Sequence, residues 1–348
     1  MAKKATTRAS SKGPRRSTGS TAGRDPAGHV STGQLPRIEV VRGLVKEAYD
    51  RFRSNKEGSN STVYPALARV SPKLFGVAVV GTTGEVVEFG DASHEFTIMS
   101  VSKPFVFALV CELLGAPKMR ELVGVNATGR AFNSTEGVER SGDGRTNPMV
   151  NAGAIATTSL VPGASTKAKW KFIQEGLSRF AGRRLAVNEE VYESASATNF
   201  RNQSLARLLQ SYGRIYIDPA EAVDLYTKQC SLDVSAHDLA VMGATLADGG
   251  VNPITKERVV APEVCHYALA VMATAGLYET SGDWLYEIGL PGKSGIGGGI
   301  VTVSPGKGGL GTFAPPLDAA GNSVKGQLVA KHLSQRLGLD LFVSAPVA

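Results

Sequence analysis

Hydrophobic residues change their spacing twice along this chain, and that change limits the fold more than any other feature. Residues 74–90 (LFGVAVVGTTGEVVEFG) are typical of a strand, a turn at Thr82–Gly84 and a second strand, hence a hairpin. Residues 299–318 (GIVTVSPGKGGLGTFAPPLD) alternate around a Pro-Gly turn. Residues from about 105 to 290 follow mostly helical spacing. We therefore expect an α+β fold, in which helices flank one antiparallel sheet built from both ends of the chain and a helical lobe is inserted between them.

These patterns predict a single domain over residues 36–348. At 348 residues the chain is long enough for one large domain or for two lobes that share a site. We expect a sheet lobe from about residues 36–97 and 290–348, and a helical lobe from about residues 98–289.

The first 35 residues are predicted to be a disordered basic tail. The chain has a net charge of +7, and most of that charge lies in residues 1–30, where one acid, Asp25, faces many lysines and arginines. Almost no large apolar residues occur there, so the segment cannot bury enough surface to offset the entropy of ordering. A solvated tail is favoured over contact with nucleic acid or an anionic surface. The tail also lacks the apolar stretch of a secretory signal.

Composition argues against several classes of protein. The three cysteines, Cys111, Cys230 and Cys265, show no regular spacing, which argues against a disulfide framework or a zinc site. No apolar run reaches the roughly 18 residues that a membrane helix needs. We therefore expect a cytoplasmic protein that has no metal site and does not span a membrane.

A serine and a lysine stand one helical turn apart in the apolar segment 97–115 (TIMSVSKPFVFALVCELLG). On a helix, Ser100 and Lys103 share a face, and Pro104 is tolerated if the helix begins near Met99. Ser100 would then lie at the positive end of the helix, where developing negative charge is favoured. A desolvated Lys103 can lose its proton near neutral pH and act as the base for Ser100. The alternative is a lysine that extends its charge to the surface.

Ser-x-x-Lys alone is a weak signal, since the pattern also occurs at Ser304–Lys307, across a Pro-Gly turn. Two further motifs strengthen it. Lys293-Ser294-Gly295 stands just ahead of a strand, and serine acyl enzymes of the penicillin-recognising type line their cleft with a Lys-[Ser/Thr]-Gly strand. The segment NPMVNAGAI carries Asn147 and Asn151, whose amides suit an amide or amino-acid ligand. Alternatively, these motifs are a glycine-rich strand edge and a helix cap.

In combination, these motifs make the chain similar to the serine-dependent glutaminases, which are relatives of the serine β-lactamases and transpeptidases. The resemblance covers roughly residues 36–330. It is carried by the stretches YPALARVSPKLFGVAVV, SVSK, NPMVNAGAI, FRNQSLA, LYTKQCSL, GATLADGGVNPIT, AGLYETSGDW, LPGKSGIGGGI and PPLDAAGNSVKG.

The resemblance implies an amidohydrolase that converts L-glutamine and water to L-glutamate and ammonia through a γ-glutamyl ester on Ser100. Lys103 would accept the serine proton, and Tyr278 would help to pass it to the leaving ammonia. The backbone N–H groups of Ser100 and Ile296 would bind the developing oxyanion. The resemblance implies no cofactor, and it implies a homodimer or homotetramer.

The same resemblance assigns substrate binding to Asn151, Asn202 and Tyr226, and it exposes two departures from the family. Tyr64 is shifted by one position within Val63-Tyr64-Pro65. Ala195 stands where the family has a glutamate that holds the α-ammonium of the substrate. Removing the partner of a desolvated charge typically costs about 2–5 kcal/mol.

Glu193 would substitute for that glutamate only if the loop bends. The departure at Ala195 leaves open an acyl-serine hydrolase for a different amide. A non-catalytic binding protein that works through its basic tail is a further alternative. A cysteine–histidine hydrolase is disfavoured, since Cys265 and His266 are adjacent on a predicted helix and point in different directions.

Overall fold

The computed structural model describes Met1 and residues 33–343. The predicted tail, residues 1–35, therefore lies outside the described residues except for Met1 and residues 33–35. Within the described part, a five-stranded antiparallel sheet has the strand order β2-β1-β7-β6-β5. Its strands are β1 (Gly76–Gly81), β2 (Val86–Gly90), β5 (Gly292–Ser294), β6 (Gly299–Ser304) and β7 (Gly308–Phe313). The prediction of one antiparallel sheet from both ends of the chain is confirmed.

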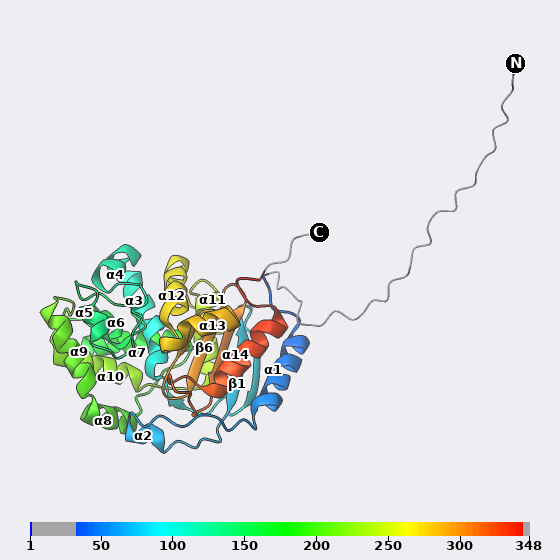
Figure 1. The fold of residues 1–348 in the computed structure, drawn as a ribbon, viewed down its shortest axis with the longest axis horizontal. Helices are drawn as coiled ribbons and strands as arrows, with labels where there is room; N and C mark the ends of the chain where they lie inside the picture. Colours follow the sequence, from blue (N-terminus) through cyan, green and yellow to red (C-terminus); the bar gives the residue numbers. More distant parts are fainter. Residues whose placement is uncertain (2–32, 344–348) are drawn as a thin grey trace.

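One face of the sheet is covered by helices from the two ends of the sequence. Helix α1 (Ile38–Phe52) and helix α14 (Val324–Leu337) lie side by side on this face (Figure 1). Helix α13 (Ser281–Ile288) packs beside α14. Their apolar side chains form a core with the alternate residues of β1, β6 and β7. Burial of this apolar surface holds the two ends of the chain together.

The opposite face is covered by helix α11 (Ala236–Ala247), which packs most closely on β7. Glycines in β7 make this approach possible. A Cβ atom at Gly311 would lie 2.0 Å from the Ala236 carbonyl oxygen, and one at Gly309 would lie 2.3 Å from that of Ala240. Residues 98–289 therefore do not form a separate lobe throughout, because α11 and α13 belong to the layers on the sheet. Helical spacing shows that a helix forms but does not show which layer it joins.

The remaining helices form the helical lobe, most of which lies at the left of Figure 1, with α12 nearer the middle. They are α3 (Ser102–Leu114), α4 (Ala116–Leu122), α5 (Glu136–Glu139), α6 (Asn151–Thr158), α7 (Thr166–Ala181), α8 (Glu189–Thr198), α9 (Phe200–Ser211), α10 (Pro219–Cys230) and α12 (Pro262–Ala275). A short helix α2 (Pro65–Ala68) packs on α8, and strands β3 (Phe96–Thr97) and β4 (Asp233–Val234) pair with each other. The helical lobe thus lies against one end of the sheet layers.

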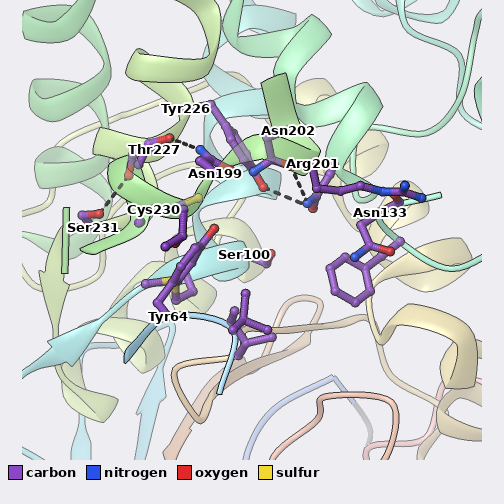
Figure 2. Close-up of a pocket in the computed structure, with 17 residues that line it drawn as sticks. Tyr64, Ser100, Asn133, Asn199, Arg201, Asn202, Tyr226, Thr227, Cys230 and Ser231 are labelled. Carbon is purple, nitrogen blue, oxygen red and sulfur yellow. Dashed lines mark hydrogen bonds between the residues drawn. The ribbon is translucent and has the colours of Figure 1, made fainter. Parts of the chain in front are cut away.

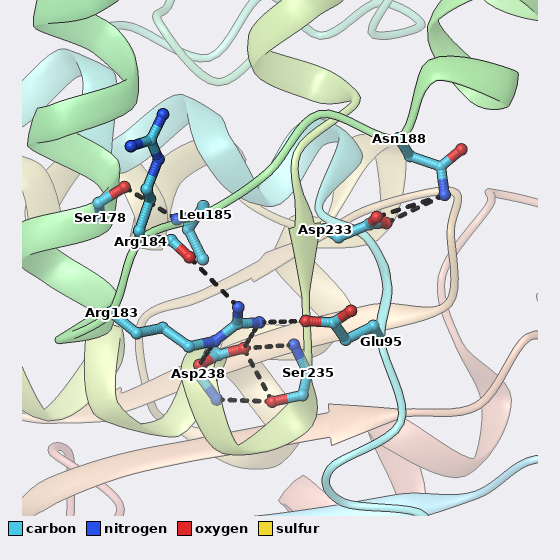
Figure 3. Close-up of polar contacts among 9 residues, drawn as sticks. All are labelled: Glu95, Ser178, Arg183, Arg184, Leu185, Asn188, Asp233, Ser235 and Asp238. Carbon is cyan, nitrogen blue, oxygen red and sulfur yellow. Dashed lines mark hydrogen bonds and ion pairs between the residues drawn. The ribbon is translucent and has the colours of Figure 1, made fainter.

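An ion pair between an exposed arginine and a buried carboxylate joins the end of α7 to the start of α11 (Figure 3). Arg183 donates from Nε to Oδ1 of Asp238 over 2.9 Å and from Nη2 to Oδ2 over 2.7 Å. The Asp238 side chain is only 2% exposed, and it also accepts from the backbone N–H and the hydroxyl of Ser235 in a capping box. Glu95 contacts the same guanidinium at 2.9 Å. Every buried carboxylate oxygen here has partners, as a stable buried charge requires.

No single helix within residues 33–343 is long and apolar enough to cross a membrane. Met99–Leu114 and Ala116–Leu122 are long and apolar enough only when taken together, and the chain bends by 115° between them. Residues 102–111 of α3 are all buried inside the protein, which explains their apolar composition.

Candidate active site

The predicted nucleophile lies in a tight turn between a strand and a helix. A 3₁₀ turn, Met99–Val101, follows β3 and leads directly into α3. The helix thus begins close to the position that Pro104 requires. Met99, next to Ser100, has a φ of 47°. A non-glycine residue in this region costs of order 1–3 kcal/mol, and such residues cluster at functional sites. The turn places Ser100, 7% exposed, at the wall of a cavity.

A glycine-rich loop packs directly against this turn. A Cβ atom at Gly297 would lie 2.6 Å from the Thr97 carbonyl oxygen, and one at Gly295 would lie 3.0 Å from that of Ile98. Only glycine allows so close an approach of two backbones. The approach brings Ile296, between them, to the wall of the same cavity as Ser100. Lys293 and Ser294, expected just ahead of a strand, themselves form the edge strand β5.

Lys103 is buried with neutral partners only. Its side chain is 1% exposed, and Nζ donates to Oδ1 of Asn151 over 2.7 Å and to the Met149 carbonyl over 3.1 Å. Burial lowers the pKa of Lys103 to about 7, against a smaller raising effect of Cys230. Within the described residues, no carboxylate pairs with this amine. The predicted desolvation of Lys103 is therefore present, and the surface alternative does not apply.

The amine does not hydrogen-bond to Ser100 in the described part of the chain. Its two contacts match the donors of a neutral amine, which has two N–H groups and one lone pair. With both N–H groups directed at the oxygens of Asn151 and Met149, the lone pair is left to accept a proton. Hydrogen bonds between catalytic groups are often long before substrate binds.

Asn151 connects the lysine to the far wall of the cavity. Its Oδ1 accepts from Lys103 and, over 3.3 Å, from the Tyr226 hydroxyl, while its Nδ2 donates to Oδ1 of Asn202 over 2.9 Å. These residues come from α3, α6, α9 and α10, which pack together. The structure thus brings Asn151, Asn202 and Tyr226 to one place, all lining the cavity. Sequence reasoning missed that Asn151 also orients Lys103.

Tyr278 lies close to Ser100. Like Met99, it has a strained backbone, with a φ of 54°. Its hydroxyl donates to the Ser294 carbonyl over 3.2 Å. Burial raises the pKa of Tyr278, and hydrogen bonding to the Ser100 hydroxyl and to the backbone of Ile296 opposes that rise. The phenol is therefore neutral, and it faces both the nucleophile and the loop of Ile296.

A second buried lysine supports this tyrosine. Nζ of Lys293 donates to the carbonyls of Ser294, over 2.6 Å, and Gly276, over 2.9 Å, and it lies 4.5 Å from the centre of the Tyr278 ring. Burial, with the charge of Lys103 as the next cause, lowers the pKa of Lys293 well below its ordinary value. Lys293 therefore anchors the strand and the tyrosine beside the nucleophile.

The cavity next to Ser100 has a volume of about 110 Å³. Figure 2 shows Tyr64, Tyr226 and Asn202 around Ser100. The cavity is lined by Val63, Tyr64, Met99, Ser100, Phe132, Asn133, Asn151, Ala195, Thr198, Asn199, Arg201, Asn202, Tyr226, Thr227, Cys230, Ser231 and Ile296. Tyr64 therefore reaches the cavity despite its shifted position in the sequence, and burial raises its pKa to about 12. Lys103 and Tyr278 are not among the lining residues.

Glu193 is not brought to the cavity. It is exposed on α8, whereas Ala195 on the same helix is buried and lines the cavity. The helix continues through residues 189–198, so the bend that Glu193 would need is not present. Arg201 and the loop of Phe132 and Asn133 are lining residues that sequence reasoning missed, because no local pattern marks their position.

The competing sequence candidates are not assembled into sites. Cys265 is buried while its neighbour His266 is exposed, and burial raises the pKa of Cys265 to about 12. Ser304 and Lys307 flank the turn between β6 and β7. No group of three or more histidine, cysteine, aspartate or glutamate side chains in the described residues could hold a metal ion.

Comparisons with known proteins point to one family. A family model described as Glutaminase matches residues 58–342. Glutaminase 2 of Yersinia pestis is 69% identical over 318 residues, which cover 91% of this chain and 94% of the relative. The solved structure of a probable glutaminase, ybaS, has a TM-score of 0.88 and 42% sequence identity to this chain. The match covers 89% of this chain and 100% of the ybaS chain. A probable glutaminase from Bacillus subtilis, complexed with 6-diazo-5-oxo-L-norleucine, has a TM-score of 0.77 and 30% identity, with coverage of 90% and 97%.

Proposed function

The chain belongs to the glutaminase family and is an amidohydrolase that converts L-glutamine to L-glutamate and ammonia, and we propose that it does so through a γ-glutamyl ester on Ser100. The observation that carries the proposed mechanism is a buried lysine without an anionic partner, one helical turn from a serine at a cavity wall. A serine hydroxyl is a weak nucleophile until a base removes its proton.

In the first half of the reaction, Oγ of Ser100 attacks the side-chain carbonyl carbon of glutamine as Nζ of Lys103 takes the hydroxyl proton. The tetrahedral oxyanion accepts hydrogen bonds from the N–H groups of Ser100 and Ile296, two residues that line the same cavity. The carbon–nitrogen bond then breaks. The leaving nitrogen receives the proton from Lys103 by way of the Tyr278 hydroxyl and departs as ammonia, which leaves the ester on Ser100.

In the second half, water attacks the ester carbonyl and gives its proton to Lys103. The ester bond breaks, Ser100 recovers a proton from Lys103, and glutamate departs. The same lysine must be neutral before each half-reaction, which a pKa of about 7 permits at physiological pH. A general base is most effective when its pKa lies near the working pH.

Substrate contacts are assigned to the cavity wall. Asn151, Asn202 and Tyr226 form one hydrogen-bonded group, whose amide and hydroxyl atoms suit a polar amino-acid ligand. Tyr64 and Ile296 complete the wall around Ser100, and Tyr278 contacts the reacting atoms from behind.

The enzyme is further assigned to the cytoplasm as a homodimer or homotetramer. Cys111, Cys230 and Cys265 are all free, which suits a reducing compartment. The assembly follows from the resemblance to the family alone, and light scattering of the purified protein tests it.

Covalent labelling of Ser100 tests the mechanism directly. The Bacillus subtilis relative was crystallised with 6-diazo-5-oxo-L-norleucine, a glutamine analogue that carries a reactive carbon. Peptide mapping by mass spectrometry should place one adduct of this analogue on Ser100 and none in Ser100→Ala. The Ser304→Ala variant, in the second Ser-x-x-Lys pair, should be labelled like the wild type. An adduct that persists in folded Ser100→Ala would overturn the assignment.

A further inference from the structure

The charges around the cavity do not match those of free glutamine. Glutamine carries an α-carboxylate and an α-ammonium. Arg201 is the charged residue of the described lining, which contains no aspartate or glutamate. Nε of Arg201 donates to the Asn133 carbonyl over 2.8 Å, and no carboxylate of the described chain pairs with its guanidinium. The cavity can therefore attract an anionic group but offers no opposite charge to a cation.

Three glutamates close to the lining residues in the sequence or in the fold do not themselves line the cavity. Glu190, on α8, forms an ion pair with Arg69. Glu279, next to Tyr278, accepts from the Phe132 N–H over 2.9 Å and is not part of the lining. Glu193 is exposed on α8. Ala195, buried in the wall, contributes only a methyl group there.

Several neutral oxygens of the lining already accept hydrogen bonds from other residues of the protein. Oδ1 of Asn151 accepts from Lys103 and Tyr226, and Oδ1 of Asn202 accepts from Asn151. The Thr227 hydroxyl accepts from Asn199 over 2.6 Å. A desolvated ammonium without an anionic partner binds poorly, since it loses its water without compensation. An uncharged nitrogen escapes that cost.

Building on the serine-acyl function proposed above, we propose that this cavity hydrolyses γ-amides whose α-nitrogen is uncharged or absent at least as efficiently as free L-glutamine. The substrate class is a five-carbon acid amide with a free carboxylate, either N-acylated or lacking the amino group. Val63, Phe132 and Ile296 give the lining an apolar part against which an acyl group can pack. Arg201 supplies the counter-charge for the carboxylate.

A panel of three amides tests this inference: L-glutamine, N-acetyl-L-glutamine and glutaramate. The kcat/KM for ammonia release by the wild type should be at least as high for one of the last two as for L-glutamine. Ala195→Glu should raise kcat/KM for L-glutamine by about tenfold or more and lower it for N-acetyl-L-glutamine, because it adds the missing charge. Ala197→Glu, on the exposed side of the same helix, should change neither.

The wild-type panel needs no variant, so the inference stays testable if Ala195→Glu does not fold. A kcat/KM of the wild type that is higher for L-glutamine than for both other amides would overturn the inference and leave the proposed function standing. Failure to release ammonia from all three amides, with folded protein, would overturn both.

Discussion

Two buried charged side chains in this molecule have opposite surroundings. Asp238 lies at the start of α11, where Arg183 and Ser235 supply hydrogen bonds to both of its oxygens. Lys103 lies at the start of α3, where its amine meets only the neutral oxygens of Asn151 and Met149. Both side chains are at most 2% exposed. Burial is thus the same, and the partner differs.

The difference decides what each group can do. Hydrogen bonding to Asp238 raises the pKa of Arg183, so the guanidinium keeps its charge and the pair joins two parts of the fold. Burial without an anion lowers the pKa of Lys103 to about 7, so its proton becomes exchangeable near neutral pH. The paired Asp238 serves the structure, and the proposed role of the unpaired Lys103 amine is proton transfer.

The largest expected effect is the loss of activity when the unpaired amine is removed. Lys103→Ala should lower kcat/KM for glutamine hydrolysis by about 10³-fold or more, because the serine loses its base. Circular dichroism should show that the variant remains folded. Lys307→Ala, from the second Ser-x-x-Lys pair, should keep wild-type activity. Activity of Lys103→Ala within about tenfold of the wild type would remove Lys103 from the mechanism.

A second expected effect is a pH-dependent stability difference between the wild type and Lys103→Met. The pKa of Lys103 is lower in the folded state, so the unfolded chain binds more protons between pH 7 and pH 10.5. The contribution of Lys103 to stability therefore rises with pH over this window, by about 1.4 kcal/mol per unit of pKa difference. In urea unfolding, the free energy of unfolding of Lys103→Met should exceed that of the wild type most at pH 7. The difference between the two proteins should narrow toward pH 10. A constant gap would mean an ordinary pKa.

A smaller effect is expected at the paired charge, and it should appear in stability instead of chemistry. Asp238→Ala should lower the free energy of unfolding by about 2 kcal/mol, since a capping box and two hydrogen bonds from a partly exposed arginine are lost together. Its kcat, where folded, should stay within about twofold of the wild type. Glu287→Ala breaks the exposed pair with Lys331 and should cost less than about 1 kcal/mol. A large kcat loss in Asp238→Ala would show that the two regions are coupled.

The sequence predicted the sheet well and the layers less well. Short apolar runs bounded by turn residues located β1, β2, β6 and β7, because both signals are local in the sequence. The position of α11 on the sheet depends on Gly309 and Gly311, whose role appears only when the helix and the strand are packed together. Helical spacing alone placed this segment in the helical lobe.

At the site, the sequence located the chemical groups but not their partners. Ser100 and Lys103 are neighbours in one motif, so local geometry was enough to relate them. The contact of Lys103 with Asn151 joins residues 48 apart in the chain, and no pattern predicts it. The fate of Glu193 depended on whether α8 bends, which spacing does not decide.

A titration of Lys103 itself tests most directly whether its buried amine loses its proton near neutral pH. Lysine labelled with ¹³C at Cε can be followed by nuclear magnetic resonance as pH is raised, with the Lys103 signal assigned by its absence in Lys103→Met. We expect the Lys103 signal to change with a midpoint near pH 7, because burial lowers the pKa of Lys103 to about 7. A Lys103 midpoint near the ordinary lysine value of about 10.4 would contradict this expectation.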